Sequence, residues 1–290
     1  MHPLFHALLG RGPVITDGAW GTELQARGLA SGEIPDAWNL SHPEAVTDVA
    51  RAYVAAGSQV ILTNTFGANR SRLAGHGLGA QAADINRHGV RLSREAAAGK
   101  ARVFASLGPT GKLLMTGEIT PEELHAVFEE QAVALAEGAP DAIVIETMSE
   151  LEEAKAALAA AKATGLPVVV CMVFDSGSEK DRTMMGATPE QVAKELTAAG
   201  ADALGANCGI SIECCLPVCR RLKAATDLPL WIKPNAGLPS VVDGRLVYPT
   251  TAEQFADQVP ALLVAGASFI GGCCGTNPEY IRAIRRRLAR

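Results

Sequence analysis

The chain has 290 residues, 48% of them hydrophobic, and a formal net charge of −5. This length excludes a small disulfide-stapled module and suits one large α/β domain or two small ones. The acidic balance argues against nucleic-acid binding, and no apolar run reaches the roughly 18–20 residues of a membrane span. We therefore expect a cytoplasmic protein with no nucleic-acid or membrane partner.

Short apolar runs recur along the chain, and helical stretches separate them. After a short first helix in residues 1–10, the predicted strands cover residues 14–18, 59–66, 102–109, 142–148, 167–174, 203–209, 229–237 and 268–275. The clearest predicted helices cover residues 44–56, 122–137, 151–164, 189–199 and 252–265, and the helical segment PEYIRAIRRRLAR closes the chain. Several helices begin with Ser or Thr before a Pro or acidic residue, and several end at a Gly, as helix caps favour.

Eight strands that alternate with helices predict a single-domain (β/α)8 TIM barrel over residues 1–290. The alternative is a doubly wound open sheet, which more often has a glycine fingerprint after its first strand. The segment DGAWGTEL, residues 17–24, does not match that G-x-G-x-x-G pattern. In a barrel of this class the active site lies at the C-terminal ends of the strands.

Polar and reactive side chains gather at these predicted strand ends, whereas the first halves of the strands are almost wholly apolar. The strand-end residues are Asp17, Gly18, Thr63, Asn64, Thr65, Glu146, Thr147, Asn207, Cys208, Gly209, Lys233, Asn235, Cys273 and Cys274. The pattern indicates a site at the mouth of the barrel, above an apolar interior.

Three of the seven cysteines, Cys208, Cys273 and Cys274, lie at strand ends. An odd number of cysteines in a chain of this class favours reduced thiols over a disulfide framework. Three sulfur ligands and one open position are typical of a catalytic zinc. Neighbouring strand residues face opposite ways, so we expect the glycines of GGCCG, residues 271–275, to free the backbone for both thiols to reach one ion.

Other interpretations of these cysteines stay open. Paired glycines after the last strand of a barrel often bind phosphate, and buried cysteines often only fill a core, whereas a disulfide between neighbours would be strained. Cys214, Cys215 and Cys219 offer competing ligands. The segment CCLPVCRRL is more typical of the buried side of a helix, so we expect core packing there, with a second metal site as the alternative. Cys171 is expected in the core.

The segments DGAWGTEL, ILTNTFGAN, IVIETM, GANCG, KPNAGLP and GGCCGTNPEY resemble, in this order, the homocysteine S-methyltransferase family. The resemblance covers nearly the whole chain and is strongest to the homocysteine-binding barrel of cobalamin-dependent methionine synthase. It implies a (β/α)8 barrel in which three cysteines hold Zn²⁺ and the zinc-bound thiolate of homocysteine attacks a methyl group to form methionine. By position these cysteines are Cys208, Cys273 and Cys274.

The resemblance also implies a set of substrate residues: Asp17, Gly18, Thr63, Glu146, Asn207 and Asn235. Asp17 with Gly18, and Glu146, would hold the ammonium and carboxylate ends of the amino acid. Asn235 matches a residue that occupies the fourth zinc position before the substrate thiol arrives. The alternative for the two carboxylates is a turn or helix-cap role, and for the other polar residues it is hydrogen bonding within the strand-end loops.

The methyl donor is left open by the sequence. One candidate is a methylated corrinoid on a separate partner protein, because we expect a chain that ends at Arg290 to lack the folate, cobalamin and activation modules of the cobalamin-dependent synthase; S-methylmethionine is another. A betaine-type donor fits less well, because Thr147 and Gly67 stand where the betaine branch has aromatic residues, and quaternary ammonium groups prefer an aromatic cage. Trp20, Trp38 and Phe66 are the aromatic residues that could still contribute.

Other classes of function also fit parts of the pattern. They are a methyltransferase for another thiol, a non-catalytic zinc-binding or redox barrel, and a phosphate-handling barrel enzyme without metal. Bound zinc and homocysteine methylation together would separate the main hypothesis from these three.

Overall fold

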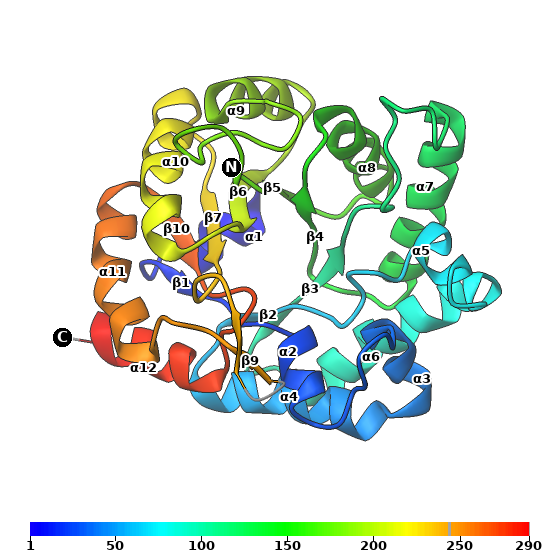
Figure 1. Ribbon diagram of the computed structural model, residues 1–290, viewed down its shortest axis with the longest axis horizontal. Coiled ribbons are helices and arrows are strands. Elements are labelled where there is room, and N and C mark those ends of the chain that lie inside the picture. The colour runs from blue at the N-terminus through cyan, green and yellow to red at the C-terminus, as the bar shows by residue number, and fades with distance from the viewer. Residues whose placement is uncertain (243–244, 290) are drawn as a thin grey trace.

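The computed structural model describes residues 1–242 and 245–289 and contains a ring of eight parallel strands surrounded by helices (Figure 1). The strands are β1 (Val14–Ile15), β2 (Val60–Ile61), β3 (Arg102–Leu107), β4 (Ala142–Met148), β5 (Val168–Met172), β6 (Ala203–Cys208), β7 (Leu230–Pro234) and β10 (Ala267–Ile270). They are hydrogen-bonded in the order β1-β10-β7-β6-β5-β4-β3-β2. The predicted (β/α)8 barrel is therefore confirmed.

Most of the helices form the outer layer of the barrel, whereas the first helix precedes the first strand and covers the N-terminal end of the barrel (Figure 1). They are α1 (Pro3–Leu9), α2 (Gly21–Gln25), α3 (Trp38–Ser41), α4 (Pro43–Ala56), α5 (Arg70–Ala74), α6 (Ala82–Ala97), α7 (Pro121–Glu137), α8 (Leu151–Ala163), α9 (Pro189–Ala198), α10 (Ile212–Ala225), α11 (Ala252–Val264) and α12 (Pro278–Leu288). The five clearest predicted helices match α4, α7, α8, α9 and α11 to within one residue at each end. Local caps explain this accuracy, as at α7, where Thr120 and Glu123 form a capping box.

The first two strands are shorter than predicted, because side chains replace part of the backbone pairing between them. β1 and β2 each cover two residues and lie at opposite ends of the strand order. Gln59 donates its N–H to the Ile15 carbonyl at 2.8 Å, and its Oε1 accepts the N–H of Ile15 at 2.9 Å. The Asp17 carboxylate accepts the N–H of Leu62 at 2.7 Å. Asp17 thus helps to close the barrel at this seam.

Apolar side chains fill the lower part of the barrel interior. This cluster is Phe5, Val14, Val60, Leu62, Phe104, Ala142, Val144, Val169, Cys171, Ala203, Trp231 and Phe269. Phe5 of α1 closes the N-terminal end, and its ring centroid lies 5.7 Å from that of Phe269. Cys171 is fully buried there, as predicted. The polar strand-end residues lie at the opposite, C-terminal end of the barrel.

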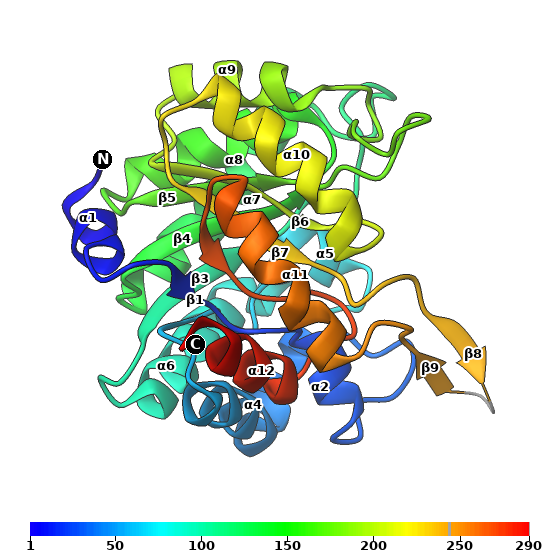
Figure 2. The same cartoon turned by 90° about the vertical axis from the view of Figure 1, so that its left-hand side faces the viewer.

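A two-stranded antiparallel ribbon of β8 (Ser240–Val242) and β9 (Arg245–Val247) projects from the molecule on the side away from α1 (Figure 2). The sequence did not predict it. Exposed apolar side chains line the ribbon, Val241 and Leu246 among them.

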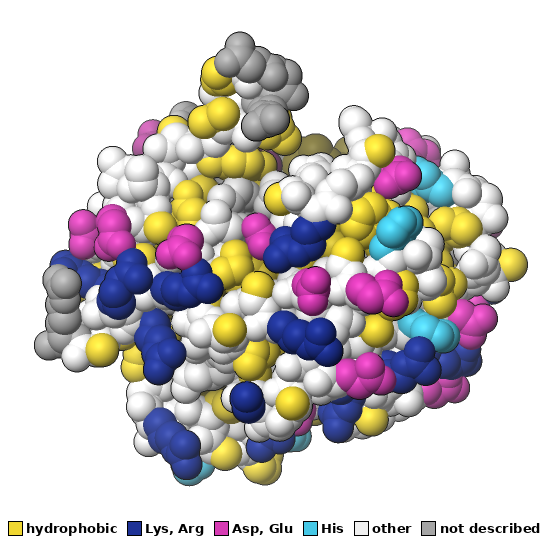
Figure 3. Space-filling model, turned by 90° about the horizontal axis from the view of Figure 1, so that it is seen from below, with side chains coloured by type: hydrophobic (Ala, Val, Ile, Leu, Met, Phe, Trp, Pro, Cys, Tyr) yellow, Lys and Arg dark blue, Asp and Glu magenta, His cyan; other side chains and the backbone are white. Residues whose placement is uncertain are grey.

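Charged side chains of both signs are mixed on the face seen in Figure 3. Two arginines near the end of α12 form ion pairs with α11: Arg286 lies 2.6 Å from Glu253 and Arg287 lies 3.7 Å from Asp257. Among the residues described, none of the helices is both long and apolar enough to cross a membrane.

Candidate metal and substrate site

Three cysteine sulfur atoms meet at the C-terminal end of the barrel. The Sγ atoms of Cys208, Cys273 and Cys274 all lie within 4.8 Å of one another, and each residue is half-buried. Zinc binds cysteine sulfur at about 2.3 Å in tetrahedral sites, which places the sulfurs roughly 3.8 Å apart. The cluster is therefore close enough to share one ion. Hydrogen bonding from Cys273 and Cys274 holds the pKa of Cys208 well below its usual range.

The backbone around the thiols has unusual geometry, for two different reasons. Cys208 has φ 62° and Gly275 has φ 82°, both in the left-handed region. For Cys208 this conformation costs about 1–2 kcal/mol, whereas glycine adopts it freely. At Gly271 the reason is close packing instead, because a Cβ atom there would lie 2.0 Å from Thr16 Oγ1. Of the three glycines in GGCCG, Gly275 alone has a left-handed conformation; that these glycines let both thiols reach one ion stays a prediction.

The turn that carries the thiol pair is anchored to the strands on both sides of β10. Gly272 donates its N–H to the Asp17 carbonyl at 3.0 Å, on the β1 side. Cys273 donates its N–H to the Pro234 carbonyl at 2.8 Å, on the β7 side. Because β10 itself ends at Ile270, these bonds set the position of the thiols.

Asn235 lies beside the thiols at the end of β7. Its Nδ2 donates to the Gly209 carbonyl at 2.6 Å and lies 3.5 Å from Cys208 Sγ. Its Oδ1 is buried and has no hydrogen-bond donor among the residues that the structure describes. A buried polar atom without a partner costs about 1–3 kcal/mol, so this oxygen is ready to bind a cation or a donor.

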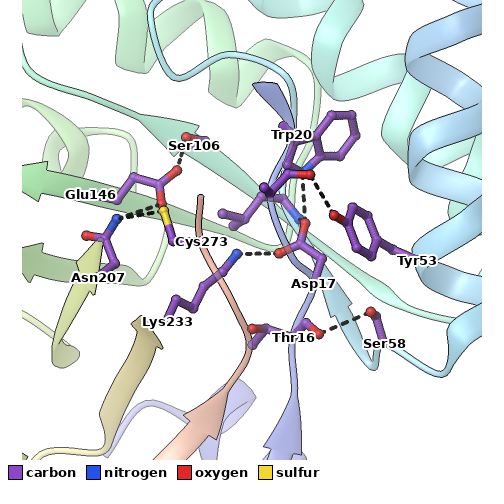
Figure 4. Close-up of polar contacts among 12 residues, drawn as sticks. Thr16, Asp17, Trp20, Tyr53, Ser58, Ser106, Glu146, Asn207, Lys233 and Cys273 are labelled. Carbon is purple, nitrogen blue, oxygen red and sulfur yellow. Dashed lines mark hydrogen bonds and ion pairs between the residues drawn. The ribbon is translucent and has the colours of Figure 1, made fainter. Parts of the chain in front are cut away.

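Glu146 supplies a carboxylate close to the cysteines (Figure 4). Its Oε1 accepts from Ser106 Oγ at 2.5 Å, and its Oε2 lies 3.4 Å from Asn207 Nδ2, which also approaches Cys273 Sγ at 4.0 Å. Burial raises the pKa of Glu146, and the Lys233 charge opposes that rise. A carboxylate offers about four acceptor positions, so Glu146 retains capacity for a cationic ligand.

Asp17 is placed differently from Glu146, since its carboxylate accepts from three donors within the protein. One oxygen accepts from Lys233 Nζ at 2.5 Å, and the other accepts from Trp20 Nε1 at 2.8 Å and from the N–H of Leu62 at 2.7 Å. The Asp17 side chain is fully buried. Burial alone would lower the pKa of Lys233, but the charges of Asp17 and Glu146 outweigh it and raise that pKa.

Gly18 and Thr63 are also packed closely within the fold. A Cβ on Gly18 would lie 2.7 Å from the hydroxyl of Tyr53 and 2.8 Å from that of Thr276. Thr63 Oγ1 accepts the N–H of Ser106 at 3.0 Å and pairs with Thr65 Oγ1 at 2.6 Å. The side chains of Asp17 and Thr63 are thus held by other parts of the barrel, whereas Glu146 and Asn235 keep unused acceptors.

The remaining cysteines lie apart from the cluster. Cys215 and Cys219 of α10 are buried, as the sequence indicates, and Cys214 is half-buried. Burial raises the pKa of Cys219 to about 12. Within the described part of the chain, Cys208, Cys273 and Cys274 form the only group of three or more potential metal ligands.

Sequence reasoning gave no role to two residues of this site. Lys233 is named only as a strand-end residue, although a lysine inside the apolar run LWIKP signals a buried ion pair. Ser106 lies in the predicted third strand, where its contact with Glu146 depends on the pairing of β3 with β4. No local signal in the sequence identifies that contact.

Comparison with known proteins places the chain among methyltransferases. A profile of the family described as Homocysteine S-methyltransferase matches residues 14–288. Methionine synthase of Mycobacterium tuberculosis is 28% identical over 304 residues, which cover 97% of this chain and 25% of that protein. Betaine–homocysteine S-methyltransferase 1 of Danio rerio is 30% identical over 301 residues, covering 95% of this chain and 73% of that protein. The chain spans about a quarter of the length of the methionine synthases that it matches.

A solved structure supports the same relationship. The metallated form of the homocysteine methyltransferase MmuM from Escherichia coli matches with a TM-score of 0.83 and 28% identity, covering 98% of this chain and 99% of that one. The apo form of the same enzyme matches with a TM-score of 0.76 and 25% identity, at the same coverage. Identities to the methionine synthase and betaine branches are nearly equal, so overall identity does not choose a methyl donor.

Proposed function

The chain belongs to the homocysteine S-methyltransferase family, and from this we propose that it moves a methyl group to the thiol of homocysteine and so forms methionine. The observation that carries the proposal is the convergence of three cysteine sulfurs near the buried carboxylate of Glu146. Thiolates bind soft metals and a carboxylate binds an ammonium group, so the two features together suit an amino acid with a thiol. The reaction would take place in the cytoplasm, where thiols stay reduced.

Cys208, Cys273 and Cys274 would hold the zinc ion. Two observations fit it: the sulfurs lie within 4.8 Å of one another, and Asn235 Oδ1 is a buried acceptor without a donor among the described residues. We propose that this oxygen fills the fourth position until homocysteine arrives. Zinc keeps a coordinated thiol deprotonated at neutral pH, and the thiolate is the nucleophilic form.

Glu146 would receive the ammonium group of homocysteine, because its carboxylate retains free acceptor positions. Gly18 would meet the substrate carboxylate with its backbone N–H. The side chains of Asp17, Thr63 and Asn207 already have partners inside the barrel, so we propose that they hold the strand ends around the substrate. Glu146 would thus bind the ammonium group of the amino acid, and the backbone N–H of Gly18 would bind its carboxylate.

The contacts of the aromatic residues favour a corrinoid-bound methyl group or S-methylmethionine over a betaine-type donor. Trp38 stacks on His42 with ring centroids 4.3 Å apart, and the guanidinium of Arg72 lies 5.6 Å from the ring centroid of Phe66. Trp20 uses its indole N–H on Asp17. A cage for a quaternary ammonium needs free ring faces, and Trp38 and Phe66 already have one face occupied. For a corrinoid donor we propose a corrinoid-carrying protein as the partner.

The experiment measures bound zinc and then methionine formation from homocysteine with S-methylmethionine, betaine and methylcobalamin in parallel. We expect one zinc per chain, methylation with at least one donor, and loss of both zinc and activity in Cys273→Ala. Full zinc content and full activity in Cys273→Ala would overturn the site. Stoichiometric zinc without any methylation would support a non-catalytic zinc-binding barrel, and methylation of other thiols alone would support a different acceptor.

A further inference from the structure

Lys233 is a buried cation that the proposed reaction does not use. Its side chain is 3% exposed, and its Nζ lies 2.5 Å from the fully buried Asp17 carboxylate. Figure 4 shows the lysine reaching from β7 towards the Asp17 side of the barrel, below Glu146 and Cys273. Burying such a pair brings little net stability in general, so its position in the fold needs another explanation.

The ion pair joins two strands that are not neighbours. β10 lies between β1 and β7 in the sheet and is hydrogen-bonded to both. Asp17 follows β1 and Lys233 belongs to β7, so the pair spans β10 just below the turn that carries Cys273 and Cys274. The approach of β1 to β10 is close because Gly271 has no side chain there; its Cβ would lie 2.4 Å from the Asp17 carbonyl.

The thiol-bearing turn is bonded to the two segments that this pair connects. Gly272 donates to the carbonyl of Asp17 itself, and Cys273 donates to the carbonyl of Pro234, the residue after Lys233. A change in the separation of Asp17 and Lys233 would therefore move both anchors of the turn. Cys208 belongs to β6 on the far side of β7, so such a movement would also change its distance from Cys273.

We propose that Lys233 is a positioning residue: its ion pair with Asp17 ties β7 to β1 across β10 and holds Cys273 at the distance from Cys208 that one metal ion requires. This role rests on the proposed function, since it concerns the same site. Lys233 does not touch the substrate in this scheme, because it lies beneath the thiols and is almost fully buried.

The test compares Lys233→Met with the double variant Lys233→Met/Asp17→Asn. The single variant leaves the Asp17 charge buried without its cation, so both folding and the site should suffer. The double variant removes both charges, so folding stability should recover, whereas the link between β1 and β7 stays missing. Lys162→Met is the matched control, since it removes a 2.8 Å ion pair with Asp202 on the outside of the barrel.

Zinc affinity is measured by competition with a chromophoric chelator, and thermal unfolding is measured on the metal-free proteins. We expect the double variant to unfold near the wild-type temperature but to bind zinc about 10–100-fold more weakly, as when residues that orient metal ligands are lost. Its kcat should fall more than its KM for homocysteine rises, and Lys162→Met should match the wild type in all three measurements.

A folded double variant with wild-type zinc affinity would overturn the positioning role, because stability and metal binding would then recover together. If Lys233→Met alone does not fold, the double variant still decides the question. A wild-type protein that binds no zinc would instead refute the proposed function, so the two failures are distinguishable.

Discussion

The side-chain amide of Asn207 forms two hydrogen bonds with Thr147. Its Oδ1 accepts the Thr147 N–H at 2.7 Å, and its Nδ2 donates to Thr147 Oγ1 at 2.6 Å. Thr147 has φ 62°, a left-handed conformation that a β-branched residue adopts only when its surroundings impose it. Because Thr147 directly follows Glu146, this contact between β6 and β4 fixes the backbone next to the carboxylate proposed to bind the substrate.

Asn207→Ala should therefore destabilise the strand ends. It leaves the Thr147 N–H without its acceptor in a largely buried site, and we expect the free energy of unfolding to fall by about 1–3 kcal/mol. Adding Thr147→Gly should restore part of this loss, since glycine adopts a positive φ without strain. Chemical denaturation of the wild type and the two variants measures the effect. An alanine variant as stable as the wild type would show that Asn207 does not hold Thr147.

Asp36 gives the protein a pH-dependent stability of known sign. Its side chain accepts the Gly67 N–H at 2.8 Å, and burial raises its pKa from 3.8 to about 6. The folded protein therefore holds this proton more tightly than the unfolded chain, so the contribution is fully present below pH 4 and is lost as pH rises to about 6. The loss amounts to about 3 kcal/mol.

Asp36→Asn should lack this component, because an amide does not titrate and its oxygen can still accept the Gly67 N–H. Denaturation at pH 4.5, 5.5 and 7.0 then compares the variant with the wild type, so that other titrating groups cancel. The stability difference should move in favour of the variant as pH rises through this window. A difference that stays constant over the three pH values would refute the assignment to Asp36.

The sequence predicts the barrel well because its signals are local. A capping residue such as Thr120 and an apolar run such as that of β4 act within a few residues, so the helix bounds are accurate. β1 and β2 are shorter than predicted because their pairing depends on Gln59 and Asp17, whose side chains replace part of the ladder. The local apolar pattern does not reveal which strand ends meet at a seam.

The thiol cluster can be predicted from the geometry of the barrel, whereas the ion pair beneath it cannot. Parallel strands bring their C-terminal ends to the same end of the barrel, so a cysteine at the end of β6 and two cysteines shortly after β10 lie at one face. The contact of Lys233 with Asp17 joins residues 216 positions apart and depends on the relative register of β1, β10 and β7. Conversely, Asp17 at a strand end indicates a ligand-binding carboxylate, but only the structure reveals that three donors of the protein already bind it.

Gly18 should be intolerant of even one added methyl group. A Cβ would meet the Tyr53 and Thr276 hydroxyls at 2.7 and 2.8 Å, in a loop that also donates from the Ala19 N–H to Thr276. We expect Gly18→Ala to lower the free energy of unfolding by about 1–3 kcal/mol, as overpacking does. Gly21→Ala is the control, because nothing lies within 4 Å of its added Cβ at the start of α2.

Thermal and chemical denaturation distinguish the two glycine variants. Gly21→Ala should be neutral or slightly stabilising, since alanine restricts the unfolded chain. Equal stability of the two variants would contradict the prediction, because it would mean that the loop at Gly18 accommodates an added methyl group.

Alanine variants of Cys219 and Cys208 distinguish a cysteine that packs the core from one that binds metal. Cys219 is fully buried in α10, with a pKa raised by burial to about 12, and its Sγ lies 3.9 Å from the Leu262 carbonyl. Cys219→Ala should keep full zinc content and lose about 1–2 kcal/mol of stability, because a small buried group is removed. Cys208→Ala should lose zinc while the metal-free protein keeps its stability, since the removed thiol is only half-buried and alanine leaves the backbone strain at this position unchanged. Zinc content by mass spectrometry and denaturation of the metal-free proteins give both readouts. If zinc content fell with Cys219 and not with Cys208, the metal would belong to α10, and the cluster at the strand ends would have to be reassigned.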